Sequence, residues 1–159
     1  MEISIVCVGT LKEQYWIDAV REYEKRLTRY CSLSIQEVKE ERTSANPSDA
    51  EEEKARIEEG KRILKLIRED ARVVALDVRG KILSSEGLAS LIQGAGVSGA
   101  SRMAFVIGGS TGLSGEVLSR ADLRLSFSAM TFPHQLMRVV LLEQIYRSFK
   151  IIKKEPYHK

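Results

Sequence analysis

The sequence predicts one α/β domain built on a parallel sheet with helices on both faces. Apolar runs of strand length alternate with helical segments along the whole chain, which is typical of parallel strands joined by right-handed crossovers. The chain has 159 residues, about the length of one typical domain. It contains no internal repeat and no low-complexity tract. We therefore expect a single domain over residues 1–159.

The first half of the chain contains four predicted elements: two strands and two helices. Residues 3–8 form an apolar run typical of a buried strand, and residues 13–27 place apolar side chains at helical spacing. Residues 33–38 alternate apolar and polar side chains, which predicts a half-buried strand. After a polar link, Ser48 or Asp49 can cap a charged helix.

The second half continues the alternation with shorter elements. Residues 73–76 predict a strand that ends in a turn at 77–80, and Ser84 or Ser85 can cap a short helix. A loop rich in Gly and Ser at 94–101 leads to the next strand. The remaining predicted elements are a strand at 103–107, a brief helix capped by Ser114, a strand at 123–127 and a long helix from about Pro133 to about Lys150.

The stretch FVIGGSTG at 105–112 places a glycine-rich turn directly after a strand. Glycine lets the backbone approach a ligand closely or adopt positive φ. The spacing does not fit the dinucleotide fingerprint G-x-G-x-x-G, because Ile107 stands where the first glycine should be, and the Lys-Ser/Thr ending of a P-loop is absent. By itself, this motif fits an ordinary turn between two elements as well as it fits a ligand-binding loop.

Composition narrows the class of protein. Hydrophobic residues make up 43% and charged residues 30% of the chain, as in ordinary globular proteins. No apolar run reaches a membrane span and no basic signal region precedes the first strand, so we expect a cytoplasmic protein without membrane contact. Cys7 and Cys31 lack CxxC spacing and there are two histidines, which predicts reduced thiols and no metal site.

Two features of the C-terminal part predict partners. The net charge is only +3, but basic residues crowd the C-terminus, where they would contact phosphates or stabilise a helix end. The last predicted helix is apolar around most of its circumference. We interpret this as contact with a second subunit in a twofold dimer, with burial inside one domain as the alternative.

Four blocks of sequence closely resemble the RlmH family. They are GGS-x-G-L at 108–113, LSFSAMTFPHQLMR at 125–138, the helix ending EQIYRSFK, and the final PYHK at 156–159. The N-terminal VGTLKEQYW is also similar to the opening of this family, so the resemblance covers the whole chain. Members are small enzymes of the SPOUT superfamily that methylate N3 of a pseudouridine in 23S ribosomal RNA, preferably within assembled ribosomes.

This resemblance implies a deep trefoil knot in the C-terminal part, roughly residues 70–159, and a cofactor, S-adenosyl-L-methionine (SAM), bound among three loops of the knot. The implied cofactor-binding residues are Leu76, Gly108, Gly109, Phe127, Ser128, Ala129, Met130, Thr131 and Phe132. Because SAM carries no phosphate, a turn that binds it needs neither of the two phosphate-binding spacings. The glycine turn is thus expected to be a cofactor loop.

The resemblance also suggests catalytic residues. His158 is the expected proton acceptor or base-orienting group, and Tyr157 the expected stacking or hydrogen-bonding partner of the flipped base. A frayed tail is the alternative for both. Arg138 would contact an RNA phosphate or the target base, with an interface salt bridge as the alternative. His134 is another candidate, with the structural role of a helix cap beside the cofactor loop as its alternative.

Two other classes of function remain open at this point. One is a non-catalytic ribosome- or RNA-binding module of the same fold, which failure to bind SAM would favour. The other is a nucleotide- or dinucleotide-dependent enzyme, which would prefer NAD or ATP in a thermal-shift screen.

Overall fold

A five-stranded parallel sheet forms the centre of the protein in the computed structural model, which describes residues 1–97 and 101–157. The strand order is β2-β1-β4-β3-β5 and every neighbouring pair is parallel, which confirms the predicted class. The strands are β1 (Glu2–Val8), β2 (Ser32–Val38), β3 (Arg72–Ile82), β4 (Arg102–Ile107) and β5 (Leu123–Ser126). The helices are α1 (Gln14–Leu27), α2 (Asp49–Leu66), α3 (Ser85–Val97), α4 (Gly115–Arg120) and α5 (His134–Ile152).

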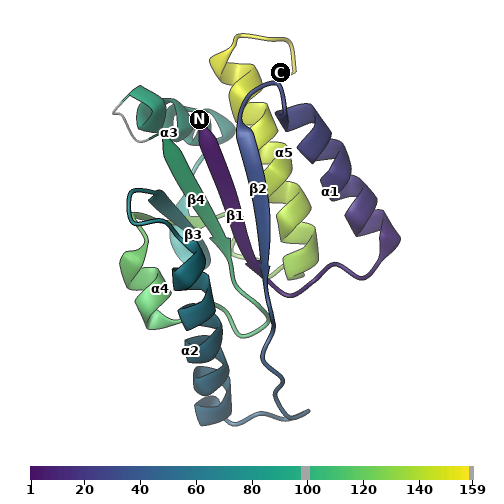
Figure 1. Cartoon of the computed structure of the whole chain (residues 1–159), viewed down its shortest axis with the longest axis vertical. Coiled ribbons are helices and arrows are strands. Elements are labelled where there is room, and N and C mark those ends of the chain that lie inside the picture. Colours follow the sequence, from purple (N-terminus) through teal and green to yellow (C-terminus); the bar gives the residue numbers. More distant parts are fainter. Residues whose placement is uncertain (98–100, 158–159) are drawn as a thin grey trace.

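Helices cover both faces of the sheet, as the sequence predicts (Figure 1). Side chains alternate along the central strands: Ile5 and Phe105 belong to the core shared with α1, α3 and α5. Val6 and Val106 point the other way, into the core shared with α2 and α4. All four side chains are fully buried. This two-sided burial explains why β1 and β4 are continuous apolar runs.

Serine caps begin three of the helices. Ser48 Oγ accepts a hydrogen bond from the Glu51 amide at 3.3 Å, and Ser114 Oγ accepts one from the Val117 amide at 3.4 Å. Ser84 Oγ accepts a hydrogen bond from the Gly87 amide at 3.1 Å, directly before α3. These bonds satisfy amides that have no partner inside the helix, and they confirm the predicted start sites.

Two expectations about element boundaries are wrong. The turn expected at 77–80 lies inside β3, which continues to Ile82 with a register shift, so that Leu125 of β5 lies opposite both Leu76 and Lys81. The loop expected from residue 94 begins later, because α3 continues to Val97. Ala95 is fully buried, and burial of this face outweighs the low helix propensity of the neighbouring glycines.

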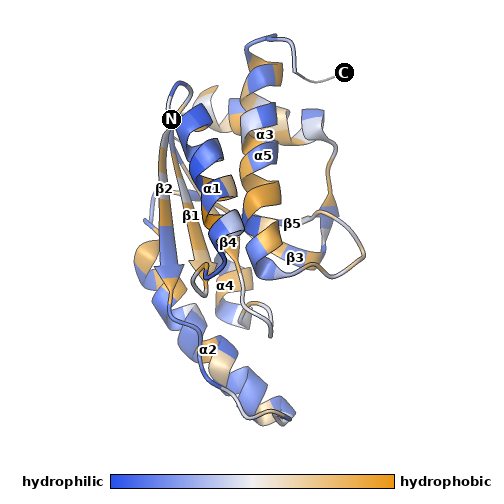
Figure 2. Cartoon of the chain, turned by 90° about the vertical axis from the view of Figure 1, so that its right-hand side faces the viewer, coloured by the Kyte–Doolittle hydropathy of each residue, from blue (hydrophilic) through white to orange (hydrophobic). Residues whose placement is uncertain are grey.

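Helix α5 packs between α1 and α3 and across the sheet (Figure 1). Leu141, Leu142 and Ile145 are fully buried within the chain, and Leu136 and Val140 are half-buried. Figure 2 shows the apolar middle of α5 beside the hydrophilic outer surface of α1. Much of the apolar circumference of α5 is therefore covered inside one chain. In the part of the chain that the structure describes, no helix is long and apolar enough to cross a membrane.

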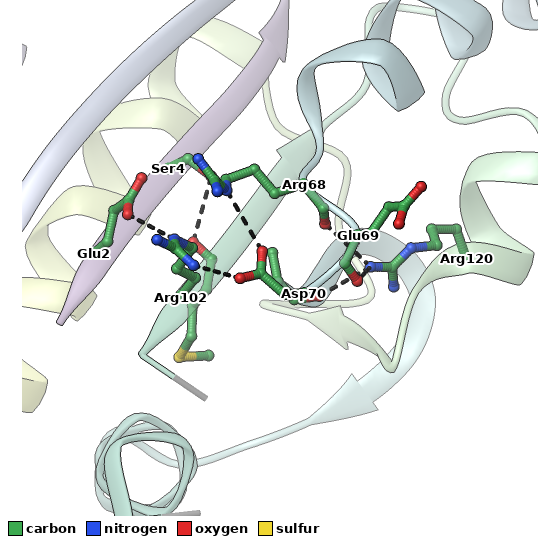
Figure 3. A network of polar contacts seen from close by, with 9 residues as sticks. Glu2, Ser4, Arg68, Glu69, Asp70, Arg102 and Arg120 are labelled. Carbon is green, nitrogen blue, oxygen red and sulfur yellow. Dashed lines mark hydrogen bonds and ion pairs between the residues drawn. The ribbon is translucent and has the colours of Figure 1, made fainter. Parts of the chain in front are cut away.

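Arginine side chains join the segments at the amino-terminal edge of the sheet (Figure 3). Arg102 Nε donates to Glu2 at 2.9 Å and its guanidinium also pairs with Asp70. Arg120 Nη2 donates to the backbone carbonyl oxygens of Glu69 and Ala71 at 3.1 and 2.9 Å. This network connects β1, β4 and α4 to the link before β3.

Candidate functional site

A cavity of about 790 Å³ opens at the carboxyl edge of the sheet. Three segments form most of its wall: 76–79 in β3, 107–113 at the end of β4 and after it, and 125–132 at the end of β5 and after it, with only Ala129 of the last segment left out. Glu53 and Arg56 of α2, Gly115 and Leu118 of α4, and His134 and Met137 of α5 complete it. Parallel strands that end at one edge bring their following loops together, which is why the three segments meet here.

The glycine turn is a tight structure that closes on itself. Gly109 and Gly112 form an isolated antiparallel bridge, and the Gly112 amide donates to the Gly109 carbonyl at 3.1 Å. A Cβ on Gly108 would lie 2.8 Å from the Gly112 backbone, so this position requires glycine. Gly112 has φ +86°, which a larger residue adopts only with strain. The glycines therefore allow the closed conformation of the turn, which forms part of the cavity wall.

Helix α2 supports the turn from behind. Arg56 Nη1 donates to the Thr111 carbonyl at 3.1 Å. A Cβ on Gly60 would lie only 2.2 Å from Ser114 Oγ, so helix and turn are in direct contact. Arg56 and Gly60 are one helical turn apart on α2, which places both on the face toward the glycine turn and the start of α4.

Glu59 of α2 is a buried carboxylic acid beside the contact between α2 and the glycine turn. Its Oε1 accepts a hydrogen bond from the Glu41 amide at 2.9 Å, whereas its buried Oε2 has no partner among the described residues. Oε2 lies 3.4 Å from where a Cβ on Gly109 would be. Burial raises the pKa of Glu59, and the charges of Glu40 and Glu41 add to this, while the Glu41 amide and Arg62 lower it.

The segment after β5 holds its shape through serine hydrogen bonds. Ser126 Oγ donates to the Ser128 carbonyl, and the Met130 amide donates to Ser128 Oγ, both at 3.0 Å. Met130 is 70% exposed and Phe132 39% exposed, although both line the cavity. Both side chains therefore leave apolar surface at the rim of the cavity.

The structure brings the expected cofactor residues together. All of them except Ala129 line the cavity: Leu76, Gly108, Gly109, Phe127, Ser128, Met130, Thr131 and Phe132. Sequence reasoning did not include Asp77 and Arg79, which follow Leu76 in β3, or Glu53 and Arg56 on α2. Their proximity depends on the sheet order, and no local motif indicates it. His134 lines the cavity and begins α5 without a side-chain cap.

Arg138 and Tyr157 lie away from this cavity within the chain. Arg138 is buried, pairs with Glu37 Oε1 at 2.5 Å and donates to the Gly9 carbonyl at 3.0 Å, so its salt bridge lies within the chain. Tyr157 Oη lies 3.3 Å from Glu143 Oε1, and its ring packs under Arg147. Glu143 is nine residues beyond His134 along α5, or about 14 Å at the helical rise. His158 lies outside the described residues.

The two thiols are free cysteines. Burial raises the pKa of both Cys7 and Cys31 to about 11, so each is protonated and a weak nucleophile near neutral pH. Over residues 1–97 and 101–157, no group of three or more His, Cys, Asp or Glu side chains could hold a metal ion.

Comparison with known proteins identifies relatives over the full chain. The family model described as Predicted SPOUT methyltransferase matches residues 1–158. Ribosomal RNA large subunit methyltransferase H of Clostridium novyi is 57% identical over 159 residues, and its counterparts in Clostridium kluyveri and Bifidobacterium adolescentis are 54% and 55% identical. Each of these matches covers 100% of both chains.

Solved structures of lower identity share the fold. A methylase family protein from Haemophilus influenzae matches with a TM-score of 0.52 at 16% identity, covering 96% of this chain and 66% of that one. A methyltransferase from Legionella pneumophila, solved with the bound cofactor SAM, matches with a TM-score of 0.51 at 11% identity, covering 94% of this chain and 66% of that one.

The raised pKa of Glu59 predicts a pH-dependent stability. A carboxyl whose pKa is higher in the folded than in the unfolded state stabilises the fold at low pH, and this contribution is lost as the pH rises through the folded-state pKa. Relative to the neutral variant Glu59→Gln, the wild type should therefore lose free energy of unfolding as the pH rises. Urea denaturation of both proteins between about pH 4 and about pH 8 measures the difference.

Glu58→Gln is the matched control on the adjacent, solvent-facing position. Lys61 lowers the pKa of Glu58, so its contribution does not fall with rising pH. A stability difference for Glu59→Gln that stays constant over the pH series would contradict the interpretation of Glu59 as a buried acid with a raised pKa.

Proposed function

Because this chain belongs to the SPOUT methyltransferase family, we propose that it transfers the methyl group of SAM to N3 of a pseudouridine in 23S ribosomal RNA, acting on assembled ribosomes in the cytoplasm. The observation that carries the proposal is the cavity at the carboxyl edge, where the glycine turn and the segment after β5 face each other. Full-length relatives named as large-subunit ribosomal RNA methyltransferases support the choice of RNA.

The residues of the cavity fit SAM. A volume of about 790 Å³ is in the ordinary range for a small-molecule site. Leu76, Ile107 and Met137 offer apolar surface for the adenine ring, and the backbone of the glycine turn offers hydrogen-bonding groups for its edge. When bound, the cofactor supplies an electrophilic methyl group on a sulfonium. The main task of the chain is then to hold donor and acceptor in line.

The tail and the last helix would serve the RNA side of the reaction. N3 of pseudouridine carries a proton that must leave, and His158 is the proposed acceptor of that proton or the group that orients the base. Tyr157 would stack on or hydrogen-bond the flipped base. Buried Arg138 would act on the RNA side only indirectly, by fixing the start of α5 through its contacts with Glu37 and Gly9. Lys153 and Lys154 are exposed and would contact phosphates.

A homodimer would complete the site. Within one chain, Tyr157 packs near the far end of α5 from the cavity. The half-buried residues Leu136 and Val140 of α5 and the exposed rim residues Met130 and Phe132 offer apolar surface for a second copy. A twofold arrangement with antiparallel α5 helices would bring the tail of one subunit to the cavity of the other.

A C-terminal trefoil knot is part of this proposal. Leu125 lies opposite both Leu76 and Lys81, so the chain between them bulges away from β5 and returns to it. A Cβ on Gly80 would lie 2.6 Å from the backbone of Arg124, which means that the returning strand packs directly against β5. The close packing of β3 on β5, which leads into α5, is compatible with the threading that the family resemblance implies.

Transfer of labelled methyl groups tests the function. Ribosomes that lack the modification, separated subunits and naked RNA are each incubated with the protein and labelled SAM, and the labelled base is identified by mass spectrometry. We expect label on N3 of a pseudouridine, strongest in assembled ribosomes. If SAM binds but no RNA substrate is labelled, the non-catalytic RNA-binding alternative is favoured.

The glycine turn gives a prediction for cofactor affinity. Gly108→Ala places a Cβ within 2.8 Å of the Gly112 backbone, so the turn must open. We expect the Kd for SAM to rise at least about tenfold, measured by calorimetry, since about 1.4 kcal/mol of distortion has this effect. Gly94→Ala, where a Cβ meets nothing within 4 Å, is the control and should leave the Kd unchanged. Unchanged affinity in Gly108→Ala would exclude the turn from the cofactor site.

Mixing two impaired variants tests whether the site is shared between subunits. With SAM held well below its raised Kd, Gly108→Ala transfers little, and deletion of residues 157–159 removes the tail. If each site combines the cavity of one subunit with the tail of the other, about a quarter of the sites in a randomly exchanged mixture have both parts intact, all of them in mixed dimers. We expect methyl transfer to reappear after subunit exchange. A mixture that stays inactive, although native mass spectrometry shows mixed dimers, would contradict a shared site.

A further inference from the structure

Asp77 lines the cavity, but it belongs neither to the glycine turn nor to the tail, and the proposed function gives it no role so far. It follows Leu76 at the point where β3 leaves its register with β5. Its side chain is only 9% exposed. Oδ1 accepts a hydrogen bond from the Arg79 amide at 3.1 Å, whereas Oδ2 is buried and has no partner within the described part of the chain. A buried carboxylate oxygen without a partner is costly and indicates a role in binding.

The other charges that line the cavity are neutralised or solvated. Arg56 donates to Glu53 from Nη2 and Nε at 2.6 and 2.9 Å, so these two side chains compensate each other. Arg79 Nε lies 3.8 Å from Asp77 Oδ1, but the Arg79 side chain is 81% exposed, and so loose a pair contributes little. Asp77 is thus the charged cavity residue, among those described, that combines burial with an incomplete set of partners.

Methyl transfer changes the charge of the molecule that the cavity is proposed to hold. The bond between the methyl carbon and sulfur breaks with its electron pair left on sulfur, the methyl group joins the target nitrogen, and the proton of that nitrogen passes to the base. The sulfonium cation thereby becomes a neutral thioether. SAM and its product S-adenosylhomocysteine are otherwise the same apart from the methyl group.

We propose that Asp77 is a specificity-determining residue that makes the cavity favour the cationic sulfonium over the neutral thioether product. A carboxylate shielded from water attracts a cation in the same cavity more strongly than an exposed carboxylate does, because less solvent screens it. This attraction ends when the methyl group is transferred, so the product leaves more readily than the cofactor. The inference rests on the proposed function, since it assumes that SAM occupies this cavity.

Calorimetry with three ligands tests the inference in the full-length protein. SAM carries a sulfonium charge, sinefungin carries an ammonium group at the same place, and S-adenosylhomocysteine carries no charge there. For Asp77→Asn, which keeps the shape of the side chain, we expect the Kd of SAM and of sinefungin to rise about tenfold and that of S-adenosylhomocysteine to change less than about threefold. Asp77→Glu keeps the charge and should retain the preference for the cationic ligands.

The matched control is Glu53→Gln, which also removes a carboxylate from the cavity wall. Arg56 already compensates the charge of Glu53. The ratio of the Kd of S-adenosylhomocysteine to the Kd of SAM should therefore stay within about twofold of the wild-type ratio. Equal weakening of all three ligands by Asp77→Asn would overturn the inference and leave the proposed function intact, since Asp77 would then only shape the wall. Failure of the wild type to bind any of the three ligands would instead overturn the proposed function itself.

Discussion

Backbone packed directly against backbone is the constraint on which the site depends. Gly80 lies so close to β5, and Gly108 so close to Gly112, that a single Cβ would collide with main-chain atoms at either place. The first contact holds β3 against β5, and the second keeps the glycine turn closed on itself; a side chain would not permit either separation. The cavity is the space left between the three segments, so its shape follows from two positions that have no side chain.

The rest of the fold supports this edge from both faces of the sheet. On one face, Arg56, Glu59 and Gly60 of α2 contact the glycine turn or lie directly behind it. On the other face, α5 begins at the cavity with His134 and is fixed near its start by the buried Arg138. Because α5 then runs away from the cavity, Tyr157 ends at its far end. This separation is the structural reason for proposing that a second subunit supplies the tail.

Much of the fold could be predicted from the sequence, because burial on both faces of a parallel sheet leaves apolar runs that periodicity detects. The strands at β1 and β4 and the serine caps at Ser48 and Ser114 are of this kind. The predicted turn at 77–80 was wrong because a polar stretch with a glycine has the same local pattern whether it ends a strand or bulges within one. Only the pairing with β5 separates the two cases.

The candidate site was predictable to a smaller extent. The glycine turn is visible in the sequence, but its spacing left its purpose open, and the resemblance to a family supplied the cofactor residues that the cavity brings together. Asp77 could not be found in this way, because its importance depends on burial and on unpaired atoms, which are properties of the folded chain. The contacts of Tyr157 with Glu143 and Arg147 likewise depend on how the tail folds back onto α5.

The most direct measurement is a crystal structure of the protein grown with saturating SAM. We expect the cofactor to lie in the cavity between the glycine turn and the segment 127–132, in contact with Leu76 and Gly108. We also expect a twofold partner whose C-terminal residues reach the methyl group. Cofactor bound at another place on the chain, with this cavity free of it, would contradict the proposed site.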